Sequence, residues 1–403
     1  MLSPIREDQG TSLSPEISMD KIIFTEFKDI NAFPSKVKNW LKNLFGKTEK
    51  KKTDNQTTLE EIEHKQEKEV GEESKLSYYY RKITNIPDRT IGWYPTAIRE
   101  GRKLFQHWAP DIIFTTVPPF TSLIVASKLA RIIDVPWVAD YRDLWSDHGY
   151  YSGSDLRKKN DKFIEKRVLS NCSGLITVTD SWVKLLKDAR NMAVELAMNG
   201  FDPDDFEKIK PKFLYPDHLT ILYAGALYHG KRDPLKLFEA LAKMGEDAKK
   251  VKVLLYTEFG KDELSDEQRK VIKDNNLEGQ IVCSTYIPQS ELHSIMAATD
   301  ILLLLRWDDK RENGVIAGKL FEYIGAGKPI LSVGGTEGEA ADIIRDNNFG
   351  LVSNDEDEIA EYLIEKLRDR TNSPNPNRDK FMRAVQFEKI EKFMDGLIAD
   401  HHS

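Results

Sequence analysis

The alternation of short apolar runs with amphipathic helical stretches constrains this chain more than any other feature. The runs at 111–116, 136–142 and 175–179 have the length and β-branched content of buried strands, and helical segments separate them. A parallel crossover needs a dozen or more residues, usually a helix, so strand–helix–strand units build a parallel sheet. The sequence therefore predicts an α/β fold.

The same rhythm starts again after a polar, proline-containing segment at 203–217. Further strands are expected at 219–225, 252–258, 281–287, 301–305 and 329–335. Two such series predict two doubly wound, Rossmann-like domains facing a cleft, at residues 76–205 and 206–380. The last helix, within 381–403, is expected to cross back onto the first domain.

Composition sets a few further limits. With 403 residues the chain is long enough for two domains, each with its own core. Its net charge is −7, so we expect no nucleic-acid partner, and any anionic ligand must be held by a local site. Its two cysteines, Cys172 and Cys283, lie far apart, which predicts neither a disulfide framework nor a zinc site. No run reaches the roughly 18 apolar residues of a membrane span, and a cytoplasmic protein is expected.

Residues 1–75 are polar and variable in pattern, which indicates a solvated helix or a loop, apart from a short apolar run at 22–24. Within them, residues 34–52 place apolar and aromatic side chains on one helical face, with lysines around it. Such a face suits a helix that lies on an anionic membrane surface. A helix packed on the sheet with exposed lysines is an equally good interpretation.

The most informative stretch is GKLFEYIGAGKPIL, at residues 318–331. Gly318 and Lys319 open a helix after the strand at 301–305, at the sheet edge where α/β proteins bind ligands. The unpaired N–H groups and dipole of a helix N-terminus suit a diphosphate, and Glu322 is placed to accept hydrogen bonds from ribose hydroxyls. Taken alone, a helix with a solvated lysine and glutamate explains the same residues.

This stretch resembles the donor-site signature of glycosyltransferase family 4, and the resemblance covers about residues 80–400. It implies a GT-B architecture, with backbone contacts to the donor's diphosphate, a nearby lysine and a glutamate on the ribose. The positions that match this donor-binding signature are Ala317, Gly318, Lys319, Leu320 and Glu322. The first glutamate of the signature is absent here, and Gly314 stands at its position.

A second match is LTILYAGALYHGKRDP, at residues 219–234. The resemblance assigns Gly225 to a close approach of backbone and phosphates, and it assigns Lys231, with Arg232 as its rival, to the leaving diphosphate. A GT-B enzyme uses no metal, so cations or a helix dipole must offset the charge that develops there. We therefore expect Lys231 and Arg232 to act in catalysis, with no metal and no other cofactor. Taken alone, a Lys-Arg pair is an ordinary surface turn.

The segment 111–145 resembles the N-terminal-domain signature of the same family. Thr116, Pro118 and Arg142 are then expected on the acceptor side, and Asp143, with His148 as its alternative, is the candidate catalytic polar group. Arg142 and Asp143 are as readily explained as a structural ion pair, and a retaining enzyme needs no protein base if the donor phosphate takes the acceptor's proton. Asp202-Pro203-Asp204 is interpreted as a turn rather than a metal site.

These resemblances predict a retaining glycosyltransferase, cytoplasmic and peripheral on the inner face of the plasma membrane. It would move a sugar from a nucleotide-sugar donor to a glycan or lipid-linked acceptor in bacterial cell-surface polysaccharide synthesis. Family members begin with a strand, a glycine-rich loop and a helix that the chain is predicted to lack. Two alternatives stay open, a non-catalytic nucleotide-binding remnant or assembly partner and a GT-B-fold nucleotide-sugar 2-epimerase.

Overall fold

The computed structural model describes residues 2–5, 18–27, 29–30, 80, 84–151, 153–207, 209–228, 230–370 and 375–403. The chain divides into two compact units, residues 1–175 with 397–403 and residues 176–396. The segment 34–52, and with it the predicted membrane-surface helix, lies outside the described residues. Among the helices that are described, none is both long and apolar enough to cross a bilayer.

The first sheet has four strands in the order β3-β4-β5-β6, and β3 and β4 pair in parallel with Ile113 opposite Trp137. Its strands are β3 (Ile113–Val117), β4 (Trp137–Tyr141), β5 (Gly174–Thr177) and β6 (Val194–Leu196). The helices along this part of the chain are α4 (Tyr94–Leu104), α5 (Thr121–Ile133), α6 (Asp155–Val168) and α7 (Asp180–Arg190). This is the strand–helix alternation that the sequence predicts.

Asp88 fixes the start of α5. One carboxylate oxygen accepts from the Thr90 amide at 2.8 Å and so caps the short helix η3 (Arg89–Trp93). The same carboxylate accepts from the Thr121 amide at 3.0 Å and from the Thr121 hydroxyl at 2.8 Å. A single side chain thereby satisfies donors of two helix N-termini, which otherwise lack partners.

A parallel strand pair lies outside both predicted series. β1 (Leu2–Ile5) pairs with β2 (Ile23–Glu26) in a sheet of its own. The indole N–H of Trp93 donates to the Thr25 hydroxyl at 2.6 Å, and the Thr96 hydroxyl donates to the Glu26 carbonyl at 2.6 Å. The prediction of loop or solvated helix was wrong for these residues. Four-residue strands are too short to show an alternating pattern, and the apolar run at 22–24 was their one signal.

The second sheet is six-stranded, in the order β12-β11-β10-β7-β8-β9, and every neighbouring pair is parallel. Its strands are β7 (Leu219–Ala224), β8 (Val251–Thr257), β9 (Ile281–Thr285), β10 (Ile301–Arg306), β11 (Ile330–Gly334) and β12 (Gly350–Val352). The helices that follow α7 are α8 (Asp204–Glu207), α9 (Leu235–Lys243), α10 (Asp266–Asp274), α11 (Gln289–Ala298), α12 (Gly318–Ala326), α13 (Glu339–Asp346), α14 (Glu356–Arg368) and α15 (Arg383–His402). All the predicted strands are present, each within two residues of its expected ends.

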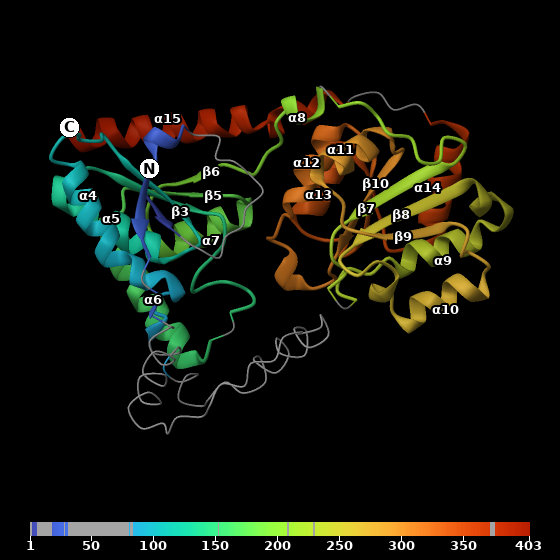
Figure 1. Ribbon diagram of the computed structural model, residues 1–403, viewed down its shortest axis with the longest axis horizontal. Helices are drawn as coiled ribbons and strands as arrows, with labels where there is room; N and C mark the ends of the chain where they lie inside the picture. Colours follow the sequence, from blue (N-terminus) through green and yellow to red (C-terminus); the bar gives the residue numbers. More distant parts are fainter. Residues whose placement is uncertain are drawn as a thin grey trace, which may run out of the picture. The chain divides into compact units, whose positions relative to one another are not determined.

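Helices cover both faces of this second sheet (Figure 1). Alternate residues of β10 divide between two cores: Ile301 and Leu303 pack with α9, α10 and α14, whereas Leu302 and Leu304 pack with α11, α12 and α13. Successive side chains of a strand point to opposite faces, so a strand buried on both sides must be apolar throughout. The unbroken apolar run at 301–305 is therefore the signature of a central strand.

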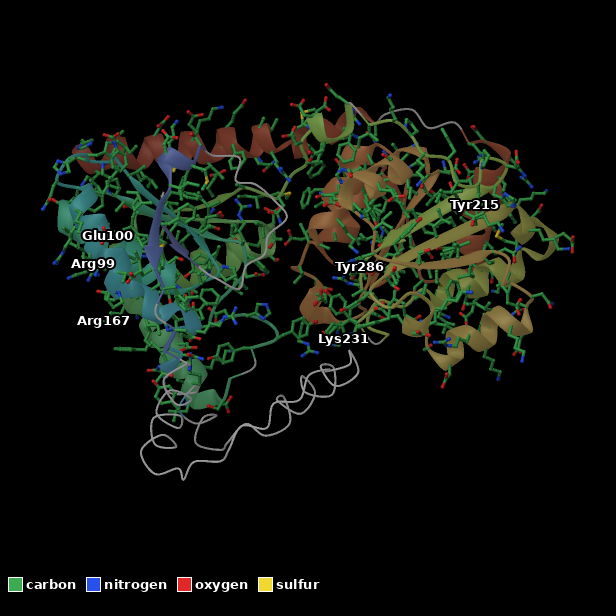
Figure 2. All side chains as sticks on the ribbon, in the orientation of Figure 1. Arg99, Glu100, Arg167, Tyr215, Lys231 and Tyr286 are labelled. Carbon is green, nitrogen blue, oxygen red and sulfur yellow. The ribbon has the colours of Figure 1, made fainter. Side chains whose placement is uncertain are left out.

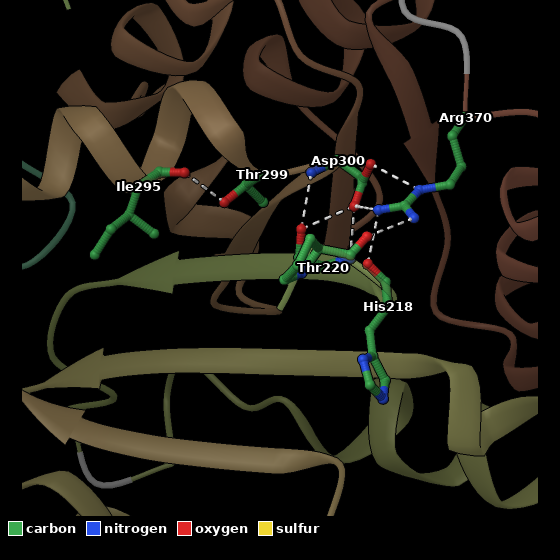
Figure 3. Close-up of polar contacts among 7 residues, drawn as sticks. His218, Thr220, Ile295, Thr299, Asp300 and Arg370 are labelled. Atoms are coloured by element: carbon green, nitrogen blue, oxygen red, sulfur yellow. Dashed lines mark hydrogen bonds and ion pairs between the residues drawn. The ribbon is translucent and has the colours of Figure 1, made fainter. Parts of the chain in front are cut away.

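Asp300 ties together the amino ends of β7 and β10 (Figure 3). Its carboxylate accepts from the Thr220 amide at 2.7 Å and from the Thr220 hydroxyl at 2.8 Å. It also accepts from Arg370 at 3.1 and 2.8 Å, and Arg370 donates to the His218 carbonyl at 2.7 Å. These contacts fix the register of the two central strands at the sheet edge where the strands begin.

Candidate active site in the second sheet

The strand order places a topological switch point between β7 and β10. From β7 the chain proceeds outward through β8 to β9, whereas from β10 it proceeds the other way through β11 to β12. The connections that leave β7 and β10 therefore diverge above their carboxyl ends, and open α/β sheets bind ligands at such points. Residues 225–228 and 230–234, which follow β7, are called the β7 loop below, and residues 307–317 are called the β10 loop.

The β10 loop leads into α12, whose amino end faces the switch point. Ala317 is the N-cap residue and makes no side-chain capping bond, and Gly318 is exposed. Glu322 lies in the second turn and is partly exposed. The Leu320 side chain is fully buried in the core beneath the helix, so this predicted donor-binding residue offers a ligand only its backbone. An uncapped helix N-terminus of this kind suits an anionic group.

Lys319 turns inward rather than toward solvent. Its ammonium group donates to the Ala224 carbonyl at 2.7 Å and lies 4.5 Å from the centroid of the Tyr223 ring. Burial, together with the neighbouring Arg232 charge, lowers the pKa of Lys319 to about 8, and Glu322 opposes that shift. The sequence predicts Lys319 near the donor's diphosphate, and in the structure its ammonium group bonds the Ala224 carbonyl at the end of β7.

Lys231 and Arg232 of the β7 loop have separate environments. The Lys231 ammonium group lies 4.3 Å from the centroid of the Trp307 ring in the β10 loop, so it reaches across the switch point. The Arg232 guanidinium carbon lies 4.6 Å from the centroid of the Tyr228 ring. Figure 2 shows Lys231 and Tyr286 at the same end of the second sheet, opposite Tyr215. Both cations thus lie among the loops at the carboxyl ends of the strands.

Three further residues organise this end of the sheet and were not singled out from the sequence. Glu263 accepts from the Leu227 amide and from the Glu258 amide at 3.1 Å, which joins the loops after β7 and β8. Arg306 is buried and donates to the Gly335 and Glu337 carbonyls at 2.6 and 2.8 Å. Trp307 is the third. Of the three, only Arg306 could have been noticed in the sequence, because it is a charged residue at the end of an apolar run.

The predicted acceptor-side residues lie at the carboxyl ends of β3 and β4. Arg142 forms an ion pair with Asp140 at 2.7 Å, and Thr116 also hydrogen-bonds the Asp140 carboxylate. The suggested ion pair of Arg142 with its neighbour Asp143 was therefore wrong. Adjacent side chains diverge at a strand end, whereas residues two apart on a strand share a face. Burial raises the pKa of Asp140, and Arg142 opposes that shift.

Asp143, Pro118 and Thr116 are the exposed members of this group, whereas Arg142 is partly buried. Asp143 is exposed, and partial burial raises the pKa of its carboxyl group while the nearby His148 opposes the shift. Pro118 follows β3 directly and is exposed as well.

Asp202 accepts from the Asp204 amide at 3.0 Å, which is the hydrogen bond of a local turn. Within the described part of the chain, no three or more His, Cys, Asp or Glu side chains are grouped to hold a metal ion.

Comparisons with known proteins indicate the class of protein to which this chain is similar. Residues 78–199 match the glycosyl transferase 4-like domain. Over 270 residues, covering 63% of this chain and 67% of the relative, the chain is 21% identical to 2-deoxystreptamine glucosyltransferase from Streptomyces kanamyceticus.

Solved structures share the fold. HepE of Anabaena, crystallised with UDP, aligns with a TM-score of 0.56 at 15% identity, over 75% of this chain and 82% of that one. Sucrose-phosphate synthase from Thermosynechococcus elongatus aligns with a TM-score of 0.54 at 16% identity, over 77% and 79%. This chain is accordingly a glycosyltransferase of the GT-B type that resembles glycosyltransferase family 4 and carries the 4-like domain at residues 78–199.

Proposed function

We propose that the site at the switch point binds a nucleoside-diphosphate sugar and transfers its sugar, with retention of configuration, to a glycan or lipid-linked acceptor. One observation carries the proposal: Lys231 and Arg232 lie on the loop that faces the uncapped amino end of α12. Two cations and a helix dipole at one point suit two linked phosphates. The HepE structures with UDP and UDP-glucose support a nucleotide-sugar donor.

In this proposal the chain's own cations offset the charge of the leaving group. The bond from the sugar's anomeric carbon to the diphosphate breaks, and negative charge develops on the departing oxygen. Lys231, Arg232 and the amide groups at Ala317 and Gly318 stabilise that charge. The acceptor oxygen bonds to the same face of the anomeric carbon, and its proton passes to the departing phosphate oxygen. Glu322 accepts hydrogen bonds from the ribose hydroxyls.

The acceptor is proposed to bind at the carboxyl ends of β3 and β4, beside Thr116, Pro118 and Arg142, with Asp143 as a polar group near the reacting hydroxyl. We place the reaction in bacterial cell-surface polysaccharide synthesis, on the cytoplasmic side of the membrane. The family resemblance of segment 111–145 supports this assignment.

Full activity in EDTA is expected, since Lys231 and Arg232 take the role that a metal ion has in metal-dependent glycosyltransferases. Loss of activity that Mg²⁺ restores would contradict this expectation.

Binding of UDP, GDP, ADP and dTDP, measured by isothermal titration, tests the donor site. We expect one of them to bind, and we expect Lys231→Ala and Arg232→Ala each to weaken that nucleotide by about tenfold or more, the effect of losing a charge-assisted contact. Lys249→Ala is the control, because Lys249 pairs with Glu246 on an exposed surface. Equal binding by all variants would refute the assignment. Tight binding without sugar transfer would favour the non-catalytic alternative.

A further inference from the structure

The backbone carbonyl groups on both sides of Gly225 accept hydrogen bonds from side chains. Before it, the Ala224 carbonyl accepts from the Lys319 ammonium group at 2.7 Å. After it, the Ala226 carbonyl accepts from the Tyr223 hydroxyl at 2.8 Å. Lys319 also lies 4.5 Å from the centroid of the Tyr223 ring, so the two side chains support each other. The chain therefore leaves β7 in a fixed direction.

Gly225 itself leaves room for the lysine. A Cβ atom at this position would lie 2.3 Å from the Lys319 nitrogen, which is closer than real Cβ contacts. The backbone there has a φ of +148°, a conformation that side-chain-bearing residues rarely adopt. The Gly225 amide donates to the Tyr256 carbonyl at 2.8 Å, which ties it to β8 as well. The backbone conformation thus favours glycine at position 225, and a side chain there would also displace the Lys319 ammonium group.

We propose that Lys319 is a positioning residue that holds the β7 loop so that Lys231 and Arg232 meet the donor's diphosphate, and that Gly225 is glycine to accommodate its ammonium group. The inference rests on the proposed function for the role of Lys231 and Arg232. It gives Lys319 a defined task in addition to the place near the diphosphate that the sequence predicts.

The expected consequence is preorganisation. A loop that carries two neighbouring cations must hold them against their mutual repulsion before a diphosphate arrives, and loop ordering costs free energy on binding. Lys319 reaches the last residue of β7, where the loop begins, from α12 on the β10 side of the switch point, whereas Glu263 reaches the loop itself from the β8 side. Loosening the Lys319 contact should therefore weaken nucleotide binding without removing any group that touches the nucleotide.

A double-mutant cycle separates this role from direct contact. The binding of UDP, GDP, ADP and dTDP is measured for the wild type, for Lys319→Met, for Lys231→Ala/Arg232→Ala and for the combined variant. We expect Lys319→Met to weaken the nucleotide that binds by about tenfold in the wild type and by less than about twofold when both loop cations are already removed. An equal loss in both backgrounds would overturn the proposal, because a direct ligand acts independently of the loop.

The Gly225 contact is tested without any nucleotide. Gly225→Ala should lower Tm by at least about 3 °C more in the wild type than in Lys319→Met, because the clashing ammonium group is then absent. Equal losses would show that Gly225 does not serve Lys319. Should no nucleoside diphosphate bind the wild type, the proposed function fails, while this stability cycle still decides the contact.

Two further readouts exclude a merely structural role. Lys319→Met should keep the wild-type Tm within about 2 °C or raise it, because methionine removes a buried charge.

The nucleotide affinity of the wild type should fall as the pH rises through 8. In that range Lys319, which faces Arg232, Glu322 and Tyr223, loses its proton. Lys319→Met should abolish this fall, and a fall that persists would contradict the proposal. Lys328→Met, a partly buried lysine that the neighbouring Asp300 charge influences, is the matched control and should leave affinity unchanged.

Discussion

Asp300→Ala should destabilise the second sheet while leaving nucleotide binding intact. The Asp300 side chain is 15% exposed and its partner Arg370 is 38% exposed, so their ion pair is solvent-screened and contributes at most about 1 kcal/mol. The buried Thr220 amide and hydroxyl lose their acceptor as well, which costs about 1–3 kcal/mol. We therefore expect a loss of about 3 kcal/mol in the free energy of unfolding, or roughly 6–12 °C in Tm.

Urea unfolding followed by circular dichroism measures this loss. Asp300→Asn retains a carbonyl oxygen for Thr220 and should lose about half as much. Asp247→Ala, which removes an exposed pair with Lys250, should change stability by less than about 0.5 kcal/mol. Because Asp300 lies where the strands begin and the β7 loop lies where they end, nucleotide affinity below the transition should be unchanged. A loss under about 1 kcal/mol would refute the assigned role of the network.

Three further predictions concern particular residues. Gly334→Ala should abolish stable folding or lower the free energy of unfolding by more than about 3 kcal/mol, because its Cβ would lie 1.9 Å from the Arg306 carbonyl oxygen and the backbone φ is +101°. Soluble yield and urea unfolding measure this loss. Trp93→Phe should cost about 2–3 kcal/mol, because Thr25 loses its indole partner and the smaller ring leaves a gap in a buried site; urea unfolding is again the measure. The free energy of unfolding of the wild type should rise relative to Lys319→Met between pH 8 and 10.5, because over that window the unfolded chain keeps a proton that folded Lys319 has released; a falling difference would contradict the lowered pKa.

The repeating part of the fold is readable from the sequence because its signals are local. The apolar run at 301–305 and the helix that ends at Gly327, in a left-handed conformation with φ of +66°, follow from burial and turn chemistry over a few residues. The strands β1, β2, β6 and β12 are three or four residues long and pair with distant segments. Such strands are stabilised by tertiary contacts that no local pattern records.

The candidate site was predictable in its location but not in its contacts. Sheet order and the helix start at Gly318 define the candidate site in the second sheet, and the sequence indicates both. Whether Lys319 faces solvent or the end of β7 depends on a side-chain direction set by the space above Gly225. Likewise, Arg142 pairs with Asp140 rather than its neighbour because of strand geometry. Which charged side chains pair in this way depends on the folded structure and cannot be derived from their spacing in the sequence.

Isothermal titration of the Lys231→Ala/Arg232→Ala variant with the nucleoside diphosphate that binds the wild type decides whether the donor site lies at the switch point. If the diphosphate binds between the β7 loop and the amino end of α12, the variant should bind at least about a hundredfold more weakly, with unchanged Tm in the absence of ligand. Wild-type affinity in that variant would contradict a donor site at the switch point.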